Sequence, residues 1–152
     1  PNKYYDYNEK NLIKIFDKIK SILESNNLQA IIIPSMRTPK KIIDFTQNYL
    51  GENNLVIKDV DKKAYLSSLS LAKYIVVTCD STSMISEAAL TGKPIYIAEI
   101  PAKSNDYRFR KFRDLFHKLK IIKNLNEKVE IWNYEILDET NRIAKEIKKK
   151  IS

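Results

Sequence analysis

The feature that most constrains the fold is the stretch 75–101, which predicts two strands joined by a polar turn and a short helix. The run 75–77 is continuously apolar, as is typical of a strand buried on both faces. A helix is expected over about 84–90, and Gly92 follows it with a residue that tolerates left-handed geometry. A second apolar strand is expected over 95–97. Hydroxyls and free backbone N–H groups at such a strand-to-helix turn are where α/β folds bind anionic ligands.

The rest of the chain alternates between helical and strand patterns. Apolar residues at helical spacing predict helices over about 8–25, 39–50, 64–72, 109–119 and 137–151. Short apolar runs predict strands over 30–33, 55–57 and 121–122, the last at a sheet edge. This alternation implies parallel βαβ units, and so a Rossmann-like parallel sheet with helices on both faces. The polar stretch 124–134 is a candidate boundary, but we expect residues 1–152 to form one α/β domain.

Composition supports a globular chain and argues against several classes of protein. Of its 152 residues 43% are hydrophobic, and no apolar run approaches the roughly 20 residues that span a bilayer. The net charge is +8, but Lys, Ile and Asn are abundant throughout the chain. Because the basic charge follows this overall composition, it is weak evidence for a polyanion, and nucleic acid is not the expected partner. The lone Cys79 excludes an intrachain disulfide and is expected to be a buried filler. A cytoplasmic location is expected, and the start at Pro1 suggests a fragment of a longer protein.

The polar turn after the strand at 75–77 is the first candidate site. Its residues are Asp80, Ser81, Thr82, Ser83 and Met84. Backbone amides at the start of a helix suit a phosphate, and Glu87 lies one helical turn beyond Ser83, a rise of about 5.4 Å. Phosphate and ribose hydroxyls in a nucleotide are similarly spaced, so Glu87 is expected to accept hydrogen bonds from a ribose. The alternative is that Ser83 is an ordinary N-cap and that the helix dipole favours Glu87.

A second polar turn, 35–39, follows the strand expected over 30–33. Ser35 supplies a hydroxyl, and Arg37 has the forked donors that suit phosphate. Thr38 is placed to cap the next helix. The alternative is that Arg37 is an ordinary surface arginine and that Thr38 only caps the helix. Because the carboxyl ends of parallel strands share one edge of a sheet, both turns are expected to meet at one crevice.

Other functional classes lack support in the sequence. His117 has no serine or aspartate partner nearby, no spacing indicates a metal site, and there is no P-loop or dinucleotide fingerprint. No residue is an evident catalytic base. The helix expected over 109–119 and its flanks carry basic residues: Arg108, Arg110, Lys111, Arg113, Lys118 and Lys120. We expect them to form a solvated face, with a membrane surface or an acidic partner as the alternative.

Several of these segments together resemble the mitochondrial-fission "elongated mitochondria" family, which has bacterial relatives. They are the turn 35–39, the segment 64–72, the run 77–88, Thr91-Gly92-Lys93-Pro94, Arg108-Phe109 and Phe112. The resemblance covers about Ile31 to Ile122. It is specific, because separated motifs occur in the right order.

More broadly, Ser-x-x-x-Glu on a helix followed by Gly-x-Pro and a strand is similar to the donor half of GT-B glycosyltransferases. In that superfamily the glutamate matching Glu87 holds the donor ribose, and the turn matching 81–84 meets the diphosphate. The resemblance implies that this chain is the C-terminal half of a two-domain protein and lacks the N-terminal acceptor domain. It also implies a nucleotide-sugar substrate and transfer without a metal or other cofactor.

Two hypotheses follow from the resemblance. In the first, the chain is the nucleotide-sugar binding half of a glycosyltransferase and is not active alone. In the second, it is a non-catalytic interaction module that acts at a membrane surface or on a protein partner. Asp80 bears on the choice, because the glycosyltransferase turn usually has glycine there and a carboxylate would oppose a phosphate. The fold alone does not decide between them.

Overall fold

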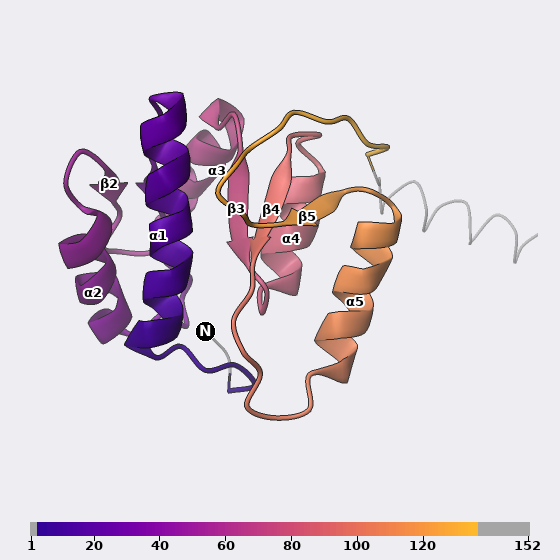
Figure 1. Ribbon diagram of the computed structural model, residues 1–152, viewed down its shortest axis with the longest axis horizontal. Coiled ribbons are helices and arrows are strands. Elements are labelled where there is room, and N and C mark those ends of the chain that lie inside the picture. The colour runs from indigo at the N-terminus through magenta and orange to yellow at the C-terminus, as the bar shows by residue number, and fades with distance from the viewer. Residues whose placement is uncertain (1–2, 137–152) are drawn as a thin grey trace, which may run out of the picture.

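The computed structural model describes residues 3–136, in which helices and strands alternate strictly (Figure 1). The helices are α1 (Glu9–Asn26), α2 (Lys40–Leu50), α3 (Lys62–Leu71), α4 (Thr82–Ala89) and α5 (Tyr107–Lys118). The strands are β1 (Ile31–Ile32), β2 (Leu55–Val56), β3 (Ile75–Thr78), β4 (Ile95–Ala98) and β5 (Ile122–Asn124). Each element predicted within this range is confirmed. The helix predicted over 137–151 lies outside the described residues.

The strands form two parallel sheets, which confirms the predicted α/β class. β1 pairs with β2, and β3, β4 and β5 pair in chain order, so that β5 lies at the predicted edge. Within the described residues no ladder joins the two sheets, because β1 and β2 are only two residues long and a cavity separates them from β3. The Rossmann-like sheet is therefore interrupted beside its third strand.

Helices cover both faces of the strands, as predicted. α1 lies on the near side in Figure 1, and α3 and α4 lie on the far side. α1 buries one apolar stripe, and the ring of its Phe16 packs with Phe45 and Tyr49 of α2, at centroid distances of 6.1 and 5.8 Å. On the far side α4 packs against β3 and β4 and buries Ile85. The carboxyl ends of the strands, where the turns lie, are thereby held between two helical layers.

The prediction that β3 is buried on both faces is wrong. Ile75 and Val77 are buried, but Val76 between them is 41% exposed. β3 is an edge strand of its own sheet, so neighbouring elements cover its middle less than they cover β4, which is buried along its whole length. The apolar run thus has one inward face and one partly open face.

This difference predicts unequal effects for two adjacent valines. Val77→Ala is expected to lower the free energy of unfolding by about 2 kcal/mol, because it removes buried methyl groups and leaves a cavity. Val76→Ala, a matched control one residue away, should cost about 0.5 kcal/mol, as at a partly exposed site. Urea unfolding of both variants measures the two values. Equal losses would mean that both faces of β3 are buried.

The stretch 124–134 is not a domain boundary, because it packs over the sheet. The ring of Trp132 meets that of Tyr96 edge to face, with centroids 5.3 Å apart. The Tyr134 hydroxyl donates a hydrogen bond to the Lys93 carbonyl at 2.7 Å. Gly92 has a φ of +71° there, and a Cβ added to it would lie 3.2 Å from the Ile136 side chain. This segment therefore belongs to the same domain as the strands it covers.

The N-terminal segment crosses to the chain that follows β4. Tyr5 forms an antiparallel bridge with Ala102, and the Asp6 N–H donates to the Pro101 carbonyl at 2.9 Å. Tyr5 is buried, and Tyr7 lines the cavity beside β3. These contacts bring two tyrosines to the carboxyl ends of the strands, where the predicted site lies.

Candidate functional site

The two polar turns line one cavity between the two sheets. Its volume is about 150 Å³. Ser35 and Thr38 reach it from the turn after β1, and Ser81 and Met84 reach it from the start of α4. Most of its other walls are apolar and come from α1, α2, β1 and β2. The structure thus brings four of the nine predicted site residues to one crevice at the carboxyl ends of β1 and β3.

The turn after β1 is held by its own side chains. The Ser35 N–H donates to the Thr38 hydroxyl at 2.9 Å, and the two hydroxyl oxygens lie 3.1 Å apart. The cap predicted for Thr38 is therefore wrong: Pro39 occupies the N-cap position of α2 and makes no side-chain cap bond. Arg37 is exposed at the tip of the turn and does not line the cavity. This turn presents two hydroxyls to the crevice and one guanidinium to the solvent.

The start of α4 has no side-chain cap. Ser81 occupies the N-cap position and is buried, but its hydroxyl caps no backbone N–H. The alternative that Ser83 is the N-cap is wrong, since Ser83 is an exposed residue of the first helical turn. The first N–H groups of a helix have no partner within the helix. The start of α4 thus keeps the donors that an anion could use.

Asp80 is turned into the protein, where Tyr7 holds it. The carboxyl is buried and accepts a hydrogen bond from the Tyr7 hydroxyl. Burial and the adjacent carboxylate together raise the pKa of Tyr7 far above its usual value, so Tyr7 remains a donor at neutral pH. Tyr7 lines the crevice, whereas Asp80 does not. Asp80, a predicted site residue, therefore positions Tyr7, a residue that no sequence pattern singled out.

Glu87 lies on the side of α4 that faces α3. It is exposed, and its Oε2 accepts a hydrogen bond from the Tyr65 hydroxyl at 2.5 Å. Burial and this hydrogen bond raise the pKa of Tyr65. Glu87 does not line the crevice, so the predicted ribose acceptor lies outside the cavity that the two turns share.

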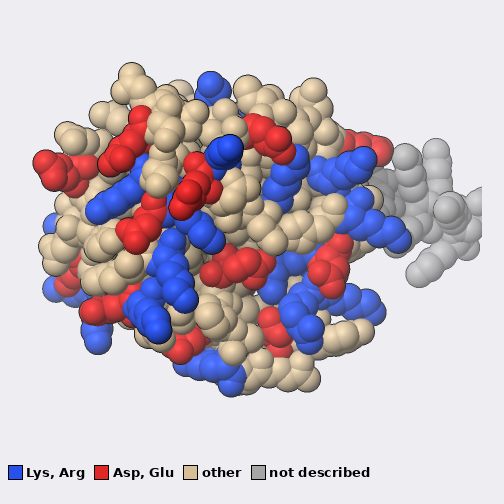
Figure 2. Space-filling model, viewed as in Figure 1, with Lys and Arg blue, Asp and Glu red and all other residues tan. Residues whose placement is uncertain are grey.

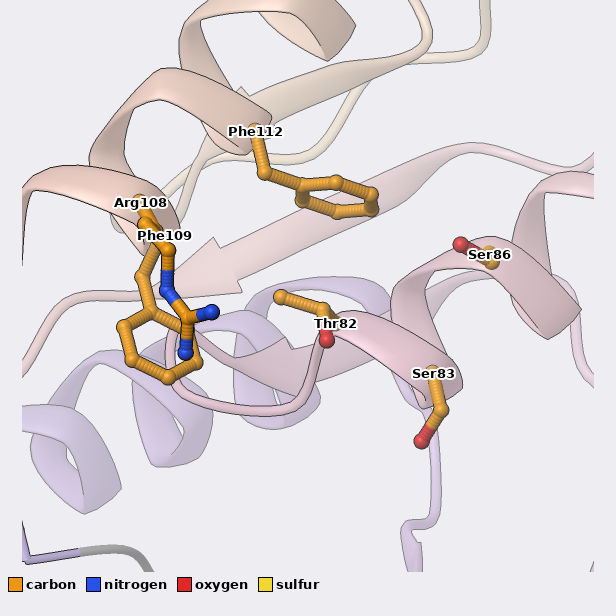
Figure 3. A pocket seen from close by; sticks show the side chains of 6 residues that line it. All are labelled: Thr82, Ser83, Ser86, Arg108, Phe109 and Phe112. Carbon is orange, nitrogen blue, oxygen red and sulfur yellow. The ribbon is translucent and has the colours of Figure 1, made fainter.

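A second cavity of about 410 Å³ opens between α4 and α5 (Figure 3). Thr82, Ser83 and Ser86 line it from α4. Arg108, Phe109 and Phe112 line it from α5. In Figure 3 the Arg108 guanidinium extends toward the first turn of α4, and the Ser86 hydroxyl is turned toward Phe112. Two predicted site residues, Thr82 and Ser83, thus belong to a cavity that sequence reasoning did not foresee.

A buried charged cluster lies beside these cavities. Arg113 is only 5% exposed and donates to the Tyr5 hydroxyl at 2.9 Å and to the Cys79 carbonyl at 2.8 Å. Arg113 also forms an ion pair with Asp106 at 3.6 Å. The Asp106 carboxylate in turn accepts a hydrogen bond from the Tyr5 hydroxyl. Burial of Asp106 opposes its ionisation, but hydrogen bonds from Tyr5 and Arg110 outweigh it and lower the pKa.

The prediction that Arg113 belongs to a solvated basic face is therefore wrong. Its spacing from Phe109 and Phe116, four and three residues, places it on the apolar stripe of α5. That spacing was the signal that could have revealed a buried arginine. Arg110 is exposed as predicted, although it also pairs with Asp106 at 2.9 Å. Basic and acidic side chains are interspersed over the face shown in Figure 2.

The remaining reactive groups offer no obvious chemistry. Cys79 is fully buried, and burial raises the pKa of its thiol to about 12, so it is a filler, as expected. Within residues 3–136 no three His, Cys, Asp or Glu side chains are grouped so as to hold a metal ion. Within the same residues no helix has the length and apolarity to cross a membrane.

Known proteins resemble this chain along almost its whole length. A Rickettsia prowazekii protein named only as uncharacterized is 32% identical over 154 residues, which is 97% of this chain and 43% of that protein. The Arabidopsis thaliana mitochondrial fission protein ELM1 is 28% identical over 144 residues, 91% of this chain and 33% of that protein. The chain thus spans less than half the length of either relative, and no solved structure matches it significantly. Since the family model described as "Mitochondrial fission ELM1" matches residues 1–151, the chain belongs to that family.

Proposed function

We infer that this chain is the nucleotide-binding half of a GT-B-like protein and that it binds the nucleoside diphosphate of a sugar donor. One observation carries the proposal: the turns after β1 and β3 line a single cavity at the carboxyl ends of parallel strands. In open α/β sheets, ligands bind in such a crevice where the order of strands changes direction. Here β2 lies on one side of β1, and the chain then returns to β3 on the far side of the cavity.

Several of the predicted residues have a role in this proposal. Ser35, Ser81 and the free N–H groups of α4 bind phosphate oxygens, and Thr38 positions Ser35 through their hydrogen bond. Arg37 is exposed beside the crevice and can fold over a second phosphate. The positive end of the α4 dipole offsets charge on a departing diphosphate, so transfer needs no metal.

The ribose is assigned to Glu87. Tyr65 already donates to Oε2, and the proposal leaves Oε1 for a ribose hydroxyl. The nucleoside would then lie toward α3, with Tyr65 beside it, and the phosphates would lie at the start of α4. Asp80 does not oppose this arrangement directly, because its carboxylate is buried and bonded to Tyr7.

The transfer reaction itself requires more than this chain. The chain covers 43% and 33% of its two relatives, and in the proposal the acceptor domain and any catalytic base lie in the rest of the protein. The second hypothesis, a non-catalytic interaction module, is favoured by the name of the Arabidopsis relative, a mitochondrial fission protein. The same experiment separates the two hypotheses.

A thermal-shift panel of UDP, GDP, ADP and CDP tests the proposal on the 152-residue chain. At least one diphosphate is expected to raise the melting temperature. Glu87→Ala should lower the affinity for that diphosphate about tenfold, which corresponds to the loss of one hydrogen bond to a charged acceptor. Glu24→Ala, which removes an exposed glutamate from α1, is the matched control and should leave binding unchanged. If no diphosphate stabilises the wild type at millimolar concentration, the interaction module is the better account.

A further inference from the structure

The outward side of α5 exposes a series of apolar side chains. Tyr107, Leu115 and Leu119 are 57%, 49% and 43% exposed. Because positions four apart lie on the same side of a helix, these three residues form one ridge along α5. α5 and α2 lie at opposite ends of the described structure (Figure 1), so the ridge is at the periphery of the molecule. Single exposed apolar residues are ordinary on a protein surface, but an aligned series is typical of an interaction surface.

Basic side chains are interleaved with this ridge. Lys111 lies on it, with its ammonium 5.9 Å from the centroid of the Tyr107 ring, and Arg108 and Lys118 are within one helical turn of it. All three cations are exposed, and within residues 3–136 none of them pairs with a carboxylate. Asp114 is the single acidic residue of the stretch 107–120. The ridge therefore combines exposed apolar groups with a surplus of positive charge.

We propose that the outer face of α5 binds the surface of an anionic lipid bilayer. This face consists of the three apolar residues and the three cations just described: Tyr107, Arg108, Lys111, Leu115, Lys118 and Leu119. The cations meet the phosphates of the headgroups, and the apolar side chains enter the boundary between headgroups and acyl chains. None of the six residues is among the described residues that line the crevice, so this contact is additional to the proposed nucleotide site.

A bilayer suits this face better than an acidic protein does. Protein-recognition surfaces gather their apolar residues in a core and keep charged residues at the rim, whereas here the two kinds alternate along one helix. Leucine is typical of helices that lie in the membrane interface, and tyrosine, with an apolar ring and a polar tip, is enriched there. Lysine carries a point charge on a flexible stem, so it can follow mobile headgroups without a fixed geometry.

Sedimentation with vesicles tests the charged part of the face. The 152-residue chain is expected to bind vesicles of equal parts phosphatidylglycerol and phosphatidylcholine about tenfold or more tightly than vesicles of phosphatidylcholine alone. At about 0.1 M salt, where the Debye length is about 10 Å, Lys111→Gln/Lys118→Gln should lower the affinity about tenfold or more. Lys14→Gln/Lys18→Gln is the matched control: it removes the same charge from two exposed lysines of α1 and should change the affinity less than about twofold.

A second pair of variants tests the apolar part of the face. Leu115→Gln keeps the charge and should lower the affinity for the anionic vesicles about fivefold, because a side chain that enters the bilayer becomes polar. Leu66→Gln makes the same change on α3 at a similarly exposed leucine, 53% against 49%, and should leave binding unchanged. Circular dichroism of each variant checks that it is folded.

Three results would overturn the inference. Absence of binding to the anionic vesicles at low salt would leave an acidic protein as the better partner for this face. Equal weakening by the two double-lysine variants would show only a general effect of net charge. Unchanged binding of Leu115→Gln would show that no apolar side chain of the face enters the bilayer. The nucleotide panel is measured without lipid, so either proposal can fail while the other stands.

Discussion

Replacing Arg113 with methionine is expected to lower the free energy of unfolding by about 3 kcal/mol, even though methionine fills a similar volume. Arg113 is only 5% exposed, and its guanidinium donates to the Tyr5 hydroxyl and the Cys79 carbonyl. Without it, these buried acceptors lose a donor, and Asp106 loses one of its two arginine partners. The cluster joins the N-terminal segment to α5, so its loss removes contacts that hold both elements in place.

Urea unfolding of the variant measures this value, and two comparisons make it specific. Arg110→Met removes an exposed partner of the same carboxylate and should cost no more than about 1 kcal/mol. Tyr5→Phe keeps the ring, removes only the hydroxyl between Arg113 and Asp106, and should cost about 1–2 kcal/mol. If Arg113→Met costs as little as Arg110→Met, the cluster contributes no more than a surface ion pair.

Local sequence patterns were enough to predict the order of elements. The helix over 84–90 and the strand over 95–97 were predicted within two residues, because helical spacing, a continuous apolar run and Gly92 all agree there. The parallel pairing followed from the alternation of elements. What these patterns cannot measure is which neighbour covers a given side chain, and so the exposure of Val76 was missed.

The candidate site was foreseen only where it depends on local sequence. Two turns at the carboxyl ends of strands were identified, and the structure places them on one cavity. Tyr7 and Arg113 were missed because their partners, Asp80 and Asp106, are set by the path of the N-terminal segment and the packing of α5. The Tyr7–Asp80 contact joins residues far apart in the chain, and no local sequence pattern indicates it. For Arg113 only the apolar spacing on α5 indicated burial, and its partners do not follow from that spacing.

The stretch after β5 illustrates the same limit, and Tyr96 explains why it packs instead of forming a linker. Tyr96 lies on the central strand of its sheet and is 1% exposed. Its hydroxyl accepts from the Glu130 N–H at 2.7 Å, and its ring meets Trp132 edge to face. Burial raises the pKa of Tyr96, which keeps the hydroxyl neutral. One side chain thus supplies both the apolar surface and the polar contact that hold a segment without regular structure.

Tyr96→Ala is accordingly expected to lower the free energy of unfolding by about 4 kcal/mol, as for other large aromatic residues removed from a core. It should also release the segment around Trp132, the only tryptophan of the chain, whose fluorescence emission should shift to longer wavelength as water reaches the indole. Tyr96→Phe keeps the ring and should cost about 1 kcal/mol with unchanged emission, because only the bond to Glu130 is lost. If the alanine variant kept the wild-type emission, Trp132 would be held by its other contacts, the Lys120 carbonyl and Lys123, and not by Tyr96.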